Sequence, residues 1–155
     1  MVHFAVVDAA RDPAITTLLA TAPETACLFS GPLPPVLAAA APWLVSLEAP
    51  SAFRDRFEGA GWQRGWGIVC AADATTAAVR KQLRQFLLAS LPDGTAVLFR
   101  FYDPRVFVPF MEAAEPPALD AWFGPVTDYW SPAPDGGTLH LRRGEGGVLR
   151  TRRRP

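Results

Sequence analysis

The chain of 155 residues has few of the side chains on which common protein chemistries depend. Lysine occurs only as Lys81, and the two cysteines, Cys27 and Cys70, each stand inside a short apolar run. We expect both to be small buried thiols, which argues against a disulfide scaffold. The chain also shows no secretory leader and no run of about 18 apolar residues, so we expect a cytoplasmic protein without a membrane partner.

Motifs for small-molecule chemistry are missing as well. The glycine-rich stretch 59–67 precedes a strand and contains two bulky indoles, whereas a phosphate-binding loop leads from a strand into a helix. The two histidines, His3 and His140, have no cysteine or carboxylate at the spacing of metal ligands, and no serine lies in a nucleophile-elbow pattern. These absences predict a protein without cofactor, metal or small-molecule substrate.

The balance of charge also argues against nucleic acid as a partner. Lysine plus arginine and aspartate plus glutamate number 15 each, but residues 140–155 hold six arginines and one glutamate. The first 139 residues are therefore acidic, and the basic charge is concentrated at the end of the chain. No aromatic residues surround these arginines, as they would in a nucleic-acid site, and a solubilising terminal segment is the simpler interpretation.

Proline and glycine residues end the predicted elements and divide the chain into alternating strands and helices. Apolar runs predict strands at 3–7, 25–30, 43–48, 66–71, 96–101 and 126–130, with 96–101 as a central strand covered on both faces. Caps and apolar periodicity predict helices at 12–21, 34–41, 51–58, 73–91, 103–114 and 116–122.

This alternation predicts one α/β domain with a central mixed, mostly parallel sheet and helices packed on it. Residues 138–142 and 148–152 are expected to form a late antiparallel edge hairpin. We place the domain at residues 1–140 and interpret residues 141–155 as a basic tail or an edge strand.

The segment around Asp103 has a structural and a chemical interpretation. Asp103 and Pro104 have the pattern of a helix cap, and Arg100 or Arg105 could pair with Asp8 to hold two strand ends together. The alternative is a small enzyme with a cleft at the end of the sheet that uses these carboxylates and arginines. We favour the structural interpretation.

Three other groups are candidates for partner contact, although each also has a simpler interpretation. The loop residues Trp62, Arg64 and Trp66 could form an interface or merely cover the edge of a core. A helix face carries Arg80, Lys81 and Arg84, and such faces are usually only solvated. The same alternatives hold for the terminal arginines Arg142, Arg143 and Arg150.

Several linked motifs between about residues 4 and 130 resemble a bacterial family that was first catalogued as a domain of unknown function. They are LFSGPLP at 28–34, APWLVSLE at 41–48, GWGI at 65–68, LRQFL at 83–87, FRFYDPR at 99–105 and FGPV at 123–126. The FRFYDPR motif contains Arg100, Tyr102, Asp103, Pro104 and Arg105.

The resemblance implies a type VI secretion adaptor, or chaperone, that binds an effector toxin and loads it onto the spike protein. Members of this family are not known for catalysis, so the resemblance implies that this chain is not an enzyme. Many members continue after the FGPV motif into a helical lobe, whereas this chain has about thirty further residues, which implies a binding surface that is smaller or differently placed. An immunity-like protein that silences the toxin is a further alternative.

Overall fold

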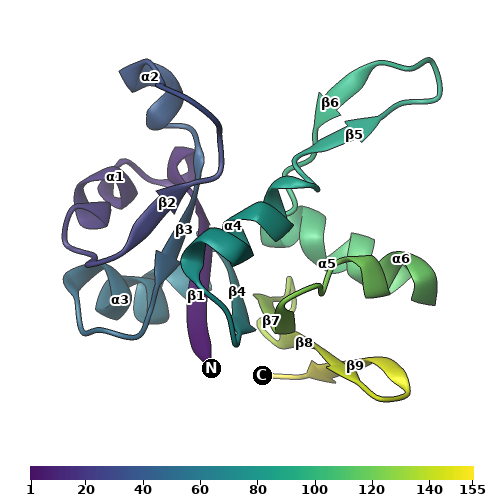
Figure 1. Cartoon of the computed structure of the whole chain (residues 1–155). Coiled ribbons are helices and arrows are strands. Elements are labelled where there is room, and N and C mark those ends of the chain that lie inside the picture. Colours follow the sequence, from purple (N-terminus) through teal and green to yellow (C-terminus); the bar gives the residue numbers. More distant parts are fainter.

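The centre of the fold is strand β1 (Val2–Asp8), whose alternate side chains enter two different cores. Phe4 and Val6 belong to one core and Ala5 and Val7 to the other, as the twofold periodicity of a strand requires. The computed structural model describes all residues, 1–155, and places helices on both faces of the sheet that contains β1 (Figure 1). β1 is thus covered on both sides.

Seven strands form the main sheet, and every neighbouring pair is antiparallel. The mostly parallel sheet predicted from the sequence is therefore wrong. In spatial order the strands are β2 (Thr25–Cys27), β3 (Pro42–Ser46), β1, β4 (Gly67–Ala72), β7 (Val126–Pro132), β8 (Thr138–Gly144) and β9 (Gly147–Arg153).

The prediction failed because the helical connections join strands that point the same way but are not neighbours. β3 and β4 both run antiparallel to β1 and lie on either side of it, so they are parallel to each other with β1 between them. In the same way β3 separates β1 from β2. Helical crossovers of this kind are typical of parallel strands, but hydrophobic periodicity does not reveal that a third strand is inserted.

The helices form one layer on each face of the sheet (Figure 1). One layer consists of α1 (Pro13–Leu19), α3 (Ala52–Arg56) and the π-helical turn Phe57–Gly61 that follows it. The other consists of α4 (Thr76–Arg84), α5 (Pro104–Ala113) and α6 (Pro116–Ala121). None of the helices has both the length and the apolar character needed to cross a membrane.

Side-chain caps fix where several helices begin. Asp12, Ser51 and Thr75 accept hydrogen bonds from backbone N–H groups in the first turns of α1, α3 and α4. The short helix α2 (Pro35–Ala38) has no such cap and begins with a proline, and it stands away from the sheet (Figure 1). The caps at Asp12 and Ser51 lie where the sequence predicted them.

Residues 85–98 depart most from the sequence prediction. The helix expected over 73–91 ends at Arg84, and the expected central strand 96–101 is only three residues long and lies outside the main sheet. Instead β5 (Leu88–Ser90) and β6 (Ala96–Leu98) pair only with each other and form an arm that projects from the body (Figure 1). An apolar run indicates a strand but does not say whether that strand is covered.

The predicted edge hairpin is confirmed, and residues 141–153 belong to it rather than to a free tail. β8 and β9 pair from Thr138↔Arg153 to Gly144↔Gly147.

The cysteines are both free, with Cys70 buried and Cys27 half-buried, and burial raises the pKa of the Cys70 thiol to about 12.

Gly67, within the GWGI motif, allows β1 and β4 to approach each other. A β-carbon at this position would overlap the backbone oxygen of Val6 and lie 2.9 Å from the α-carbon of Val7. The motif glycine is thus required by close packing of the strands.

We predict that Gly67→Ala lowers the free energy of unfolding by about 3 kcal/mol or more, because the backbone of β1 cannot move away without disturbing both cores. Gly146→Ala is the matched control, since a β-carbon there meets no atom within 4 Å. Urea denaturation of both variants measures the difference. Equal midpoints for the two variants would contradict this account of the motif.

Candidate partner-binding site

The end of β1 is tied to the base of the arm by an ion pair. Asp8 is only 1% exposed, and its Oδ2 accepts a hydrogen bond from Arg100 Nη2, while its Oδ1 accepts one from Ala10 N at 2.9 Å. The Arg100 side chain is 43% exposed, so water still reaches one side of the pair. The hydrogen bond to Asp8 raises the pKa of Arg100, which keeps the guanidinium charged.

The predicted cap at Asp103 is confirmed. Asp103 Oδ1 accepts hydrogen bonds from Arg105 N at 2.9 Å and from Arg105 Nε at 3.1 Å, and Oδ2 accepts one from Arg105 Nη2 at 2.7 Å. Burial acts to raise the pKa of Asp103, but the hydrogen bonds and charge of Arg105 outweigh it, and the pKa lies below its usual value. Pro104 occupies the first position of α5, where a missing N–H has no cost.

Tyr102, which belongs to the same motif, lies in the protein interior. Its ring is buried and meets the ring of Phe101 edge-on at 5.5 Å. Burial, together with the nearby charge of Asp8, raises the pKa of Tyr102 to about 12, so its hydroxyl is protonated at neutral pH. The motif residues thus hold the strand end, the helix start and the aromatic core together, as the structural interpretation predicted.

The loop residues predicted to contact a partner have different surroundings. Trp66 is 1% exposed and packs under Gly61, so its indole cannot reach a partner, and that assignment is wrong. Trp62 is half-buried and meets the Phe57 ring edge-on at 6.2 Å, while Arg64 is exposed. Of the three, only Trp62 and Arg64 present side chains to solvent.

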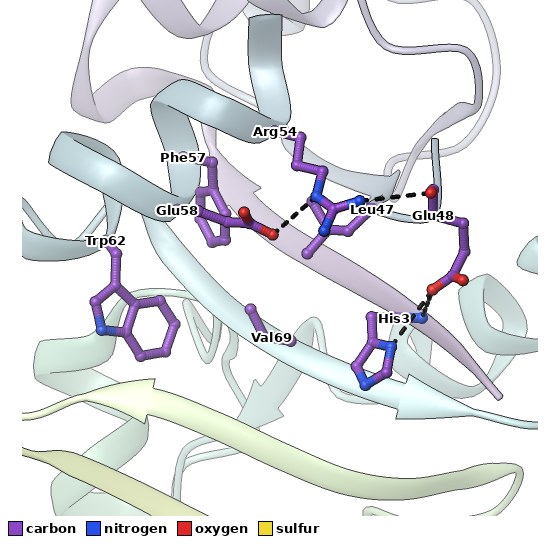
Figure 2. Close-up of a pocket in the computed structure, with 8 residues that line it drawn as sticks. All are labelled: His3, Leu47, Glu48, Arg54, Phe57, Glu58, Trp62 and Val69. Carbon is purple, nitrogen blue, oxygen red and sulfur yellow. Dashed lines mark hydrogen bonds and ion pairs between the residues drawn. The ribbon is translucent and has the colours of Figure 1, made fainter. Parts of the chain in front are cut away.

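Trp62 lies at one end of a pocket of about 520 Å³ over β1 and β4 (Figure 2). The ionisable side chains along this pocket are already paired, because His3 Nδ1 lies 3.4 Å from Glu48 Oε1 and Arg54 Nε donates to Glu58 Oε1 at 3.0 Å. The other histidine, His140, lies 2.7 Å from Asp128, and no group of three potential metal ligands occurs in the structure.

The arginines on α4 bind the segment that follows β2 instead of forming an open basic face. Arg80 Nε donates to Cys27 O at 2.6 Å and Nη2 donates to Phe29 O at 3.1 Å, while Arg84 donates to the Ser30 hydroxyl. The predicted partner role of Arg80 and Arg84 is corrected accordingly. Their side chains hold the segment after β2 against α4.

The arginines of the edge hairpin also contact the protein itself. Arg150 Nη1 donates to three carbonyls at the end of α5, those of Met111, Glu112 and Ala114, at 3.0, 2.8 and 3.4 Å. A cation at a helix C-terminus satisfies carbonyls that have no partner within the helix. Arg142 and Arg143 are exposed and lie 3.9 Å from Asp128 and 3.4 Å from Asp120, respectively. Arg150 is thus a structural residue.

The arm is the surface that the sequence did not reveal. Leu88 is 67% exposed and Leu98 is 45% exposed, and Leu91 and Phe110 are exposed nearby. An apolar pocket of about 220 Å³ lies where the arm joins the body. It is lined by Gln85, Phe86, Leu88, Ala89, Phe99, Phe110 and Trp122.

The aromatic side chains under this apolar pocket are packed against one another. Phe86 stacks on Trp122 with ring centroids 3.9 Å apart, and Phe99 meets Phe110 edge-on at 5.0 Å. Phe99 N also donates to Leu87 O at 2.7 Å, which closes the base of the arm. The only sequence signal was the pair of leucines at 88 and 98, which were predicted to lie in a helix and in a covered strand, respectively.

Comparison with known proteins gives one match. The profile of a family described as "Domain of unknown function (DUF4123)" matches residues 3–121. No curated protein and no solved structure matches the chain.

We predict that Arg100→Ala lowers the free energy of unfolding by about 1–3 kcal/mol, because it leaves the buried Asp8 carboxylate without its countercharge. The partial exposure of Arg100 keeps the loss below that of a fully buried pair. Arg56→Ala, an exposed arginine without an ion pair, is the matched control and should change stability by less than about 0.5 kcal/mol. Indistinguishable denaturation curves for the two variants would show that the pair does not stabilise the fold.

We predict that Arg80→Ala lowers the free energy of unfolding by about 1–3 kcal/mol, since two carbonyls lose their donor. Lys81→Ala, on the neighbouring exposed residue of α4, should leave it within about 0.5 kcal/mol of the wild type. Thermal denaturation followed by circular dichroism measures both. The structural role of Arg80 is refuted if its variant melts together with the Lys81 variant.

Proposed function

The chain belongs to the DUF4123 family, and from this we propose that it is a type VI secretion adaptor that binds an effector toxin and loads it onto the spike protein. The family is associated with such adaptors. An adaptor has to recognise one protein and present it to another, so it needs exposed surfaces with apolar anchors rather than a site for chemistry.

The observation that carries the proposal is the arm with its exposed leucines. Monomeric proteins seldom expose neighbouring large apolar side chains without a partner to cover them. Leu88 and Leu98 lie directly opposite each other in the β5–β6 pair, and the apolar pocket opens beside Leu88. An apolar side chain of the effector would fill this pocket, and the two leucines would cover it.

The base of the arm makes such binding favourable. Arg100 holds the end of the arm to Asp8, and Phe99 is fixed between Leu87 and the rings of Phe110 and Trp122. A surface that is already ordered loses little conformational entropy when it binds. The arm therefore has the exposure and the rigid anchorage that effector binding requires.

The test uses a bacterium in which the gene is deleted and then restored as wild type or as the double variant Leu88→Asp, Leu98→Asp. We expect the deletion and the double variant to abolish secretion of the effector encoded beside the gene and its co-purification with the spike. Two buried charges at the interface should weaken effector binding at least about a hundredfold. Leu149→Asp, which places the same charge on an exposed leucine of β9, should behave as wild type.

Two results would refute the proposal. One is a deletion strain that secretes the effector normally but is killed by it, which would indicate an immunity role. The other is a folded double variant, checked by circular dichroism, that still brings the effector to the spike as the wild type does.

A further inference from the structure

A second pocket, which we call the basic pocket, lies beside the Asp103 cap and has a volume of about 390 Å³. Three arginines from three separate segments line it: Arg11 after β1, Arg64 before β4 and Arg105 in α5. Its lining consists of four polar side chains, three prolines, two glycines and Ala133, whereas the pocket at the arm is lined mainly by apolar side chains. The two pockets therefore suit different chemical groups.

Protein acceptors hold two of the three guanidinium groups of the basic pocket, those of Arg11 and Arg105, and all three groups still have free donors. Arg105 uses Nε and Nη2 on Asp103, which leaves Nη1 free. Arg11 Nη2 donates to Arg64 O at 3.0 Å, and its other nitrogens make no hydrogen bond. Arg64 lies 4.0 Å from Asp12, which is too far for a hydrogen bond, and 64% of its side chain is exposed.

The carboxylates around the basic pocket are occupied by the protein itself. Asp103 accepts three hydrogen bonds from Arg105, and Asp12 Oδ1 accepts one from Ala14 N. Asp8 is bound to Arg100 and Ala10 N. The lining of the basic pocket itself contains three arginines and no carboxylate, so several guanidinium donors there have no acceptor.

The walls of the basic pocket are rigid and leave its entrance open. Pro104, Pro132 and Pro134 line it, and proline has little conformational freedom to lose on binding. Gly65 has a φ of +67° and contributes no side chain, and a β-carbon there would lie 3.7 Å from Pro104 and 3.8 Å from Arg11. The positive φ favours glycine here, and the glycine leaves the space beside Pro104 and Arg11 free of a side chain.

We propose that the basic pocket binds a carboxylate on an extended segment of the effector. Guanidinium groups pair with carboxylates through two parallel hydrogen bonds, and arginines already fixed by protein acceptors are well placed to form them. The carboxylate comes from an aspartate or glutamate side chain or from the end of the effector chain. The identity of the peptide as an effector rests on the proposed function, whereas carboxylate binding by the pocket does not.

The first experiment measures binding of short fluorescein-labelled peptides by fluorescence anisotropy. The probe contains aspartate and glutamate and is made with a free and with an amidated C-terminus, and a third version replaces the acidic residues with asparagine and glutamine. If the peptide with an amidated C-terminus still binds but the asparagine and glutamine version does not, side-chain carboxylates are the ligand. The reverse result identifies the terminal carboxylate, and equal binding of all versions overturns the proposal.

The second experiment assigns binding to the pocket. Arg11→Gln and Arg64→Gln should each weaken the preferred peptide by roughly tenfold, because each removes charged donors. Arg56→Gln, an exposed arginine outside the basic pocket, should bind as the wild type does. If the two pocket variants bind the peptide like the wild type while their melting curves are unchanged, the proposal is overturned.

Effector pull-down separates this proposal from the proposed function. The pocket variants should retain less effector than the wild type although their arm is intact. The pocket variants could bind the effector fully while the Leu88→Asp, Leu98→Asp variant does not. This result would show that the effector does not supply the carboxylate, and it would leave the proposed adaptor function unaffected.

Discussion

The pairing of Arg100 with Asp8 is the contact on which the other candidate surfaces depend. Asp8 ends the central strand, and Arg100 lies between the arm and the Asp103 cap of α5. The ion pair therefore connects the end of the central strand with the segment that joins the arm to α5. It also sets the position of Arg105, and with it one wall of the basic pocket.

Local features of the sequence predicted local structure well. The caps at Asp12, Ser51 and Asp103 begin helices as expected, because a short polar side chain before a helical segment satisfies N–H groups there. The edge hairpin was also predicted. The order and direction of the strands could not be predicted, since the residues of β3 do not indicate that they lie between β1 and β2.

The same limit explains the errors in the candidate site. Arginines at positions 80, 84 and 150 suggested open basic surfaces, but their side chains bind segments far away in the sequence: Arg80 and Arg150 bind carbonyls, and Arg84 binds the Ser30 hydroxyl. Leu98 was expected in a covered central strand and Leu88 in a helix, yet both are exposed because β5 and β6 pair only with each other. A residue type indicates what a side chain can do, and the tertiary partner decides whether it is free to do it.

The arm and the basic pocket together describe an adaptor that holds its effector at an apolar and at an anionic point. Hydrogen–deuterium exchange of the protein alone and in complex with the effector tests this directly. The account predicts slower exchange at residues 88–98, and also around residues 63–65 and 104–106, with residues 138–153 unchanged. Slower exchange confined to residues 138–153, with no change at residues 88–98, would contradict it.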